Sequence, residues 1–427
     1  MIRHLKFLAR KPIFWFYLIL FIDAIRVSSR SATGDFEPIM LALRRVSENK
    51  ELYKLGIDHP EYVYSPIFIS LLYPLHYLNQ FSLRFFWYVI SCLSIFGSLK
   101  VSAYLGSIQS KDDTHKSKNY WIISLAALWY VCYYNVLNGQ ATPLILFLTL
   151  SAFAIEYHSK NPNKSLYSAL CLAGALSIKP FPLIFFPLFS LSTLAICFGA
   201  LLISFIGSSL FLQEGPITLI KSWISINKEQ QTIYDITDWG HQSVFSLWWR
   251  IFGMTSKEAM HIQLLQPSTI CIATTLIMLV IGYLFVIKRD KFLGLLFGLC
   301  LWTLLPPTAW KHYYITLLTP VLFFVSQWRD GFTVNLRQTF QYLKDNLSPY
   351  RMGIWILIIG NLLQYVRFGG ERHYLYRKSW LVFAGLAFCF AIFLKAYKKA
   401  NPSDSSLKDS KINSLSAGKG SVLTTLQ

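Results

Sequence analysis

The chain has 427 residues, of which 54% are hydrophobic, 16% aromatic and only 14% charged. A soluble domain carries about 25% charged residues and alternates apolar with polar positions, so this composition excludes a soluble globular protein. The formal net charge of +19 comes from basic residues scattered between apolar blocks, which argues against nucleic-acid binding and favours contact with anionic membrane lipids.

The apolar residues occur in unbroken blocks, such as 13–22, 144–155 and 270–287. Because backbone groups inside a bilayer must be satisfied within their own segment, these blocks predict helices, and their lack of period-two alternation argues against a barrel. The seven cysteines stand singly with no C-x-x-C pair, which is typical of small core residues and not of a metal or disulfide frame. The sequence therefore predicts an all-α polytopic membrane protein.

Four basic residues precede the first predicted span at 12–27, which places the N-terminus in the cytoplasm. No small-residue cleavage site follows this span, so we expect a retained helix and not a signal peptide. The polar stretch 28–64 then lies outside. Residues 65–79 are apolar but short and contain two prolines, and we expect them to form a helix at the outer interface.

The sequence predicts about twelve membrane spans including the first. Several of them are too short to cross a bilayer without tilt. An even count places both termini in the cytoplasm and the loops 28–64 and 213–265 outside, with interfacial helices in these loops. We expect a single domain over 1–396 in the plasma (inner) membrane and a disordered cytoplasmic tail over 397–427. The other predicted spans are 84–106, 120–137, 140–157, 165–179, 181–191, 192–212, 266–287, 291–306, 313–327, 350–366 and 379–396.

Polar groups at membrane depth are costly, so they are the most informative residues of such a chain. Four clusters of them fall on the predicted outer side: 34–38 (GDFEP), 138–140 (NGQ), Lys179-Pro180, and 306–314 (PPTAWKHYY). Loops with unrelated roles would be spread over both sides. This shared side predicts one outward-facing pocket at the membrane edge.

Each cluster also has an ordinary explanation. Asp35 is equally typical of a solvated loop acid, and Asn138-Gly139 is a common turn pair. Lys179 has a stem long enough to reach a lipid head group, and His312 stands among aromatic residues that favour the interface.

The order of these elements resembles glycosyltransferase family 87 of the GT-C superfamily, over roughly residues 12–330. The resemblance is carried by an acid after the first helix, NGQ, the Lys-Pro break, an NQS-like element, and P-x-x-W-x-H at 307–312. The NQS-like element reads Gly240-His241-Gln242-Ser243 and leads to Arg250. Two features depart from the family pattern. His241 stands where Asn is usual, and 190–194 (SLSTL) lacks the usual basic cluster.

The resemblance implies a GT-C-type fold and a cell-envelope hexosyltransferase. Such an enzyme moves mannose from a polyprenyl-phosphate donor to a lipid or glycan acceptor on the outer face, with inversion. Asp35 then matches the general base and His312 a second catalytic group. Lys179, Lys311 and His312 would face the leaving phosphate. The further substrate-binding candidates are Glu37, Asn138, Gln140, His241, Gln242, Ser243 and Trp310.

No cofactor or metal is expected, although the Asp35-x-Glu37 pair offers carboxylates of the kind that hold a divalent ion. A nucleotide-sugar donor is excluded because no Gly-rich phosphate-binding loop is present. Two other classes stay open. A transporter or flippase also uses broken helices, but would show two halves with matched interruptions. A lipid-glycan polymerase or ligase would place its functional residues in one long late outer loop.

Overall fold

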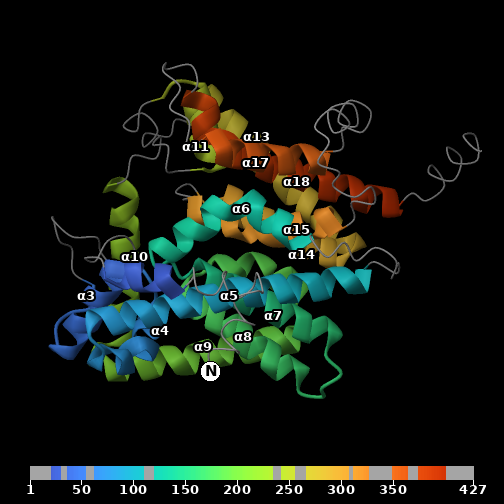
Figure 1. Ribbon diagram of the computed structural model, residues 1–427. Coiled ribbons are helices and arrows are strands. Elements are labelled where there is room, and N and C mark those ends of the chain that lie inside the picture. The colour runs from blue at the N-terminus through green and yellow to red at the C-terminus, as the bar shows by residue number, and fades with distance from the viewer. Residues whose placement is uncertain are drawn as a thin grey trace, which may run out of the picture.

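The computed structural model describes residues 21–29, 36–53, 62–109, 120–233, 242–254, 266–306, 311–326, 349–363 and 374–400. Within these ranges every regular element is a helix and no strand occurs, which confirms the predicted all-α class for this part of the chain (Figure 1). The physical cause is the one expected in a bilayer, where a helix satisfies its backbone groups within a single segment.

A helical segment at 21–28 comes first in the described chain. The helices that follow are α3 (Phe36–Ser47), α4 (Pro66–Leu72), η1 (Tyr73–Tyr77), α5 (Gln80–Gln109), α6 (Tyr120–Leu137), α7 (Thr142–His158), α8 (Lys164–Ile178), η2 (Phe181–Leu188), α9 (Leu191–Phe211), α10 (Pro216–Ile233), α11 (Val244–Ile251), α13 (Pro267–Arg289), α14 (Lys291–Leu304), η3 (Lys311–Leu317), α15 (Leu318–Ser326), α17 (Pro349–Leu363) and α18 (Tyr374–Ala400).

Four of the described helices are long and apolar enough to cross a membrane, within α5, α9, α13 and α18. The helices α6 and α7 pass the same test together, but they meet at a bend of 115°. Four other apolar helices are shorter, with 10–17 residues each. The described chain thus supports a membrane protein with several spans, and the count of about twelve stays a prediction.

The predicted span at 181–191 is wrong. These residues form the 3-10 helix η2 (Phe181–Leu188), which begins beside Pro180 and contains Pro187. Proline removes a backbone donor and clashes with the preceding turn, so an α-helix of spanning length does not form here. The helix expected at 65–79 is present as α4 and η1, while the tail after 400 and most of the first predicted span lie outside the described residues.

The bundle is held by neighbouring helix pairs: α7 packs against α5 and α8, α8 against α9, and α18 against α14 and α17. Its largest fully buried side chains include Trp302, Trp380, Tyr314, Phe185 and Phe388. Figure 1 shows the axes of α5, α7, α8 and α9 lying roughly parallel to one another. The two ends of these helices therefore define two ends of the bundle.

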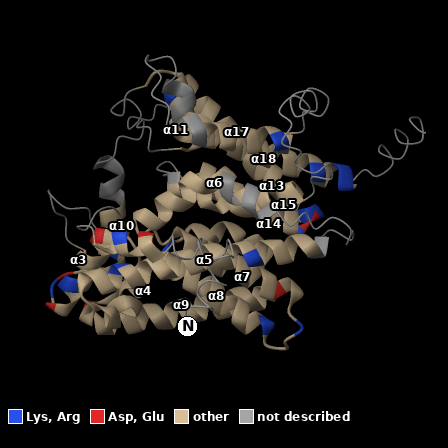
Figure 2. Ribbon diagram, in the orientation of Figure 1, with Lys and Arg blue, Asp and Glu red and all other residues tan. Residues whose placement is uncertain are grey.

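Basic side chains gather at one end, at the last turns of α13 and α18 and the first turn of α14 (Figure 2). Lys399 there lies 2.6 Å from Asp290, the residue whose carboxylate caps α14. The C-terminal end of α7 belongs to the same end, because Glu156 accepts hydrogen bonds from Ser190 and Thr193, and Lys291 of α14 donates to the carbonyl of Pro187 just before them. We call this the basic end of the bundle.

The opposite end carries α3, α10 and the turn between α6 and α7, with acidic and basic side chains both present near α3 and α10 (Figures 1 and 2). The helix α8 begins at the basic end with Lys164, so its C-terminal residue Ile178 and the following Lys179 lie at the opposite end. The helix α14 runs in the same sense, and η3 follows its C-terminus. We call this the mixed-charge end.

Candidate active site at the mixed-charge end

The turn between α6 and α7 is built by Asn138-Gly139-Gln140. Gly139 has a φ of 63°, in the left-handed region that favours glycine. The side-chain amide of Asn138 donates to the carbonyl of Tyr134 over 2.9 Å, and the backbone N–H of Gln140 donates to the carbonyl of Asn135 over 2.9 Å. These bonds satisfy the carbonyls that the end of α6 leaves open. The turn predicted from the Asn-Gly pair is therefore present.

Two buried polar atoms at this turn have no hydrogen-bond partner within the described part of the chain. Gln140 is 2% exposed, and among the described residues its Oε1 has no hydrogen-bond partner. The same holds for Oγ1 of Thr142, which is 1% exposed. Buried acceptors of this kind are rare and costly, so they indicate a water or ligand contact at this turn.

His312, the second predicted catalytic residue, lies in η3 and is 3% exposed. The side-chain amide of Asn135 donates to its backbone carbonyl over 2.9 Å. Its ring is stacked with Tyr134 at 6.4 Å between ring centroids, and meets Tyr313 edge-on at 4.3 Å. The last turns of α6 thus fix His312 next to the turn at 138–140.

Lys179 follows the last residue of α8 in an extended conformation, as expected for a residue before proline. Its ammonium group lies 4.6 Å from the ring centroid of Tyr64 and 5.3 Å from that of Tyr313, and its Nζ is 3.5 Å from the Tyr313 hydroxyl. Cation–π contacts of this kind hold a charge in apolar surroundings. Lys179 is therefore held between two aromatic rings, one of which belongs to Tyr313, the residue after His312.

A hollow lies beside the first residue of α3, and Asp35 itself falls outside the described residues. Phe36 of α3 contacts Trp87 at 6.3 Å between ring centroids, and the guanidinium of Arg84 lies 5.8 Å from the Phe36 ring. Both rings, Arg84 and Gly139 line the hollow. Glu37 is half-buried in the first turn of α3, within electrostatic range of Arg84.

Gln242 and Ser243 are fully buried at the start of α11. The hydroxyl of Tyr314 donates to the Gln242 carbonyl over 2.6 Å, which ties this segment to η3. The Ser243 side chain accepts from the backbone of Ser246, and the Ser246 side chain accepts from the backbone of Ser243. The hydroxyl of Ser243 therefore has a helix-capping role.

Besides Asp35, three of the predicted site residues are not placed. His241 and Trp310 lie outside the described residues, and Lys311 begins η3 with a side chain that is also outside them. Within the described ranges no group of three or more histidine, cysteine or acidic side chains is arranged to hold a metal.

The contacts connect the polar clusters, the Lys179-Pro180 and 306–314 clusters directly and the others through Asn135 and Trp87. Lys179 meets Tyr313, Asn135 bonds the carbonyl of His312, and the indole N–H of Trp87 donates to the Gly139 carbonyl over 2.7 Å. Trp87 then connects the turn to Phe36, next to the acidic segment. The predicted residues that the structure describes at 37, 138, 140, 179 and 312 consequently lie at one end of the bundle.

Sequence reasoning missed the residues that make these connections. Asn135 and Arg84 are buried polar residues inside predicted spans, so their cost at membrane depth was a usable signal. Trp87 and Tyr64 had no such signal, because aromatic residues are common throughout this chain.

A comparison with curated proteins returned no match. The sequence profile described as Glycosyltransferase family 87 matches residues 62–307, which is more than half of the chain and includes the turn at 138–140, Lys179 and the 240–243 element. The all-helical bundle is consistent with the GT-C superfamily. The chain belongs to glycosyltransferase family 87.

Proposed function

We propose that this membrane glycosyltransferase moves a hexose, mannose in the resembled enzymes, from a polyprenyl-phosphate donor to a lipid or glycan acceptor. In this proposal the reaction takes place on the outer face of the plasma membrane and inverts the anomeric carbon. Membership of the family supports the reaction class. The donor, the sugar, the acceptor and the side are our proposal.

The observation that carries the proposal is the place of Lys179. Its ammonium group is held between Tyr64 and Tyr313, beside the buried His312 and at the same end of the bundle as the turn at 138–140. Departure of a sugar from a lipid phosphate leaves negative charge on the phosphate oxygens, which a fixed cation stabilises where the charge develops. No proton donor is required, because the phosphate leaves as an ion.

The neighbouring groups suit a sugar. The Oε1 of Gln140 has no hydrogen-bond partner in the described part of the chain, and an amide of this type bonds hydroxyl groups. Lys179 lies over the rings of Tyr64 and Tyr313, so the cation and the turn would contact different parts of the donor. We assign the phosphate to Lys179 and the sugar hydroxyls to the turn.

Inversion in one displacement needs one base to accept the proton of the acceptor hydroxyl. Asp35 directly precedes α3, whose Phe36 packs against Trp87 beside the turn. The outward orientation is supported by the basic end of the bundle, since lysines and arginines favour the cytoplasmic side.

The test is Asp35→Asn, with Glu37→Gln as the matched control, assayed by transfer from a polyprenyl-phosphate sugar to a membrane-extracted acceptor. Asparagine keeps the size and removes the proton-accepting charge, so turnover should fall about 100-fold to 10,000-fold while protein level and donor binding persist. Loss in Glu37→Gln alone would move the base to Glu37. Full activity of both variants would remove the first outer segment from the mechanism.

A further inference from the structure

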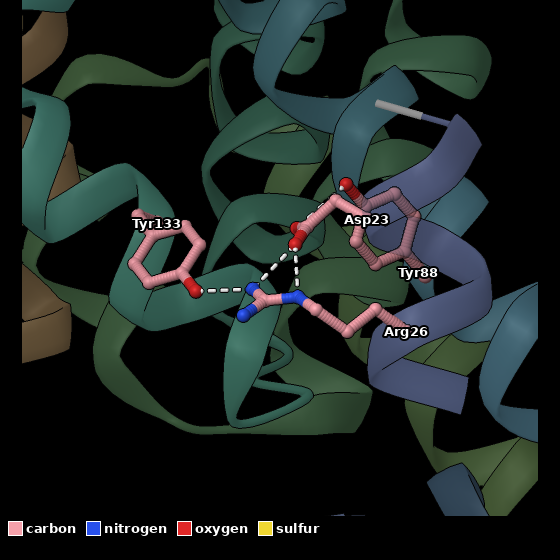
Figure 3. Close-up of polar contacts among 4 residues, drawn as sticks. All are labelled: Asp23, Arg26, Tyr88 and Tyr133. Carbon is pink, nitrogen blue, oxygen red and sulfur yellow. Dashed lines mark hydrogen bonds and ion pairs between the residues drawn. The ribbon is translucent and has the colours of Figure 1, made fainter. Parts of the chain in front are cut away.

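Two charged residues stand in an otherwise apolar helical segment at 21–28 (FIDAIRVS). Asp23 and Arg26 are one turn apart, and the guanidinium donates to Oδ1 of Asp23 from Nε at 2.9 Å and from Nη2 at 2.5 Å (Figure 3). The Asp23 side chain is 20% exposed and that of Arg26 47%. Both residues stand near the outer end of the predicted first span, and pairing is the usual way in which membrane proteins retain charges in an apolar segment.

Tyrosines from two other helices complete the cluster. Tyr133 of α6 lies with its hydroxyl 2.5 Å from Nη2 of Arg26, which donates to it. The hydroxyl of Tyr88 in α5 donates to the second carboxylate oxygen of Asp23 over 3.2 Å. Figure 3 shows the four side chains converging from three separate helices. We call Asp23 and Arg26, held by Tyr88 and Tyr133, the tyrosine-clamped pair.

The same three helices form the walls of the hollow beside α3. Three residues that line the hollow come from them: Val27, which directly follows Arg26; Tyr88, which bonds Asp23; and Val136, one helical turn after Tyr133. Phe36, the residue after Asp35, closes the hollow from α3. The tyrosine-clamped pair therefore spans the helices whose spacing sets the shape of this hollow.

We infer that Asp23 and Arg26 are positioning residues of the transferase, which hold the segment 21–28 against α5 and α6 and fix the width of the hollow beside α3. This rests on the proposed function, which places the acceptor base at the start of α3. The pair acts through the helices it joins. Weakening it shifts Val27 and Tyr88 and lowers the affinity for the substrate held there, with the reacting groups left in place.

Arg26 bonds a charged group, Asp23, and a neutral one, Tyr133. Conservative substitutions can therefore remove each bond separately. Tyr133→Phe removes one hydroxyl and keeps the ring in α6. Arg26→Lys keeps a charge that reaches Asp23 but lacks the planar fork that serves Asp23 and Tyr133 together. Arg26→Met removes the charge and keeps the length. Tyr104→Phe, a half-exposed tyrosine near the other end of α5, is the matched control.

The enzyme is assayed in lipid nanodiscs with the membrane-extracted acceptor as the varied substrate and the polyprenyl-phosphate sugar at saturation. Tyr133→Phe should raise the KM for the acceptor by up to about tenfold, the limit set by one lost hydrogen bond to a charged group, with kcat within about twofold. Arg26→Met should raise KM more than Tyr133→Phe does, and Arg26→Lys should raise it by an amount between those two variants. Tyr104→Phe should match the wild type. Unchanged KM in Arg26→Met and Tyr133→Phe would overturn the inference. So would a loss of activity that is explained entirely by a smaller amount of folded enzyme.

Hydrogen–deuterium exchange supplies a readout that needs no turnover. Arg26→Met should speed exchange both in 21–29 and in 133–140, because the clamp joins the two segments. Faster exchange confined to 21–29 would overturn the inference, since the pair would then hold only its own helix. If the wild type transfers no sugar from this donor, the proposed donor is wrong, and the exchange experiment still decides whether the pair positions the hollow.

Discussion

The indole Nε1 of Trp87 donates a hydrogen bond of 2.7 Å to the carbonyl oxygen of Gly139. This bond joins α5 to the turn between α6 and α7, and the same indole packs against Phe36 at the start of α3. Trp87 is 3% exposed, so neither contact competes with bulk water. One side chain thus connects the proposed base segment with the turn that presents Gln140.

Gly139→Ala should destabilise the protein and lower transfer. The φ of 63° is unfavourable by about 1–2 kcal/mol for a residue with a side chain. An added Cβ would also lie 2.7 Å from the Cβ of Phe36. Thermal unfolding and transfer of the purified protein measure both effects. Gly106→Ala in α5, where an added Cβ meets nothing within 4 Å, is the control and should unfold at or above the wild-type temperature. Equal behaviour of the two variants would contradict the prediction.

Asn135→Leu should lower transfer through its effect on His312. The substitution keeps the volume of the side chain and removes the donor of the 2.9 Å bond to the His312 carbonyl. A buried acceptor left without its donor costs about 1–3 kcal/mol, so η3 should shift or lose stability. Transfer rates at saturating donor, with protein level as reference, check this. Asn161→Ala in the exposed loop before α8 serves as control. Wild-type transfer in Asn135→Leu would show that α6 does not position His312.

Lys179→Met should weaken donor binding, because methionine keeps an unbranched chain between the rings of Tyr64 and Tyr313 but carries no charge. We expect kcat/KM for the donor to fall about tenfold or more, because the lost cation would contact the phosphate both in the bound donor and as the sugar departs. Lys179→Arg should retain part of the affinity, since a guanidinium also stacks on aromatic rings.

The matched control for this prediction is Lys164→Met, because Lys164 is an exposed lysine at the other end of the same helix. It should leave donor kinetics unchanged. If Lys179→Met and Lys164→Met show the same kcat/KM for the donor, Lys179 does not contact the donor phosphate, and its ring contacts have only a packing role.

The membrane orientation predicts that α3 faces outward and that the tail is cytoplasmic. Ser47, an exposed residue at the end of α3, should react as Ser47→Cys with an impermeant thiol reagent in intact cells. Ser405→Cys should react only after the membrane is opened. Both variants are made in a background without the seven native cysteines. Labelling of Ser405→Cys in intact cells would contradict the even number of spans.

The membrane class and the helical fold could be read from the sequence because hydropathy is a local property. A run of apolar residues such as 270–287 has one stable conformation in a bilayer, whichever helices surround it. The turn at Asn138-Gly139 was predictable for the same reason, since both residues favour it by themselves. The order of short motifs was enough to indicate the family, which the profile match over 62–307 confirms.

Local reasoning failed where proline and burial act together. Residues 181–191 are apolar and were expected to span, but Pro180 and Pro187 limit them to the 3-10 helix η2. The loop at 213–265, predicted to lie outside and to carry interfacial helices, contains the helix α10, but its contact with a distant segment was not predicted: Trp223 and Asn227 donate to the carbonyl of Val63. The surface that α10 contacts is formed by a distant segment of the chain, so no pattern within the loop predicts the contact.

The amino-acid sequence by itself determined that the chain is a helical membrane protein of this family, and it indicated several polar clusters in apolar surroundings. Tertiary structure alone decided which residues meet. Asn135 and His312 are 177 positions apart, and Arg26 and Tyr133 are 107 apart. Their contacts depend on how the helices rotate and cross. That geometry is set by packing over the whole bundle, and no single helix contains the information.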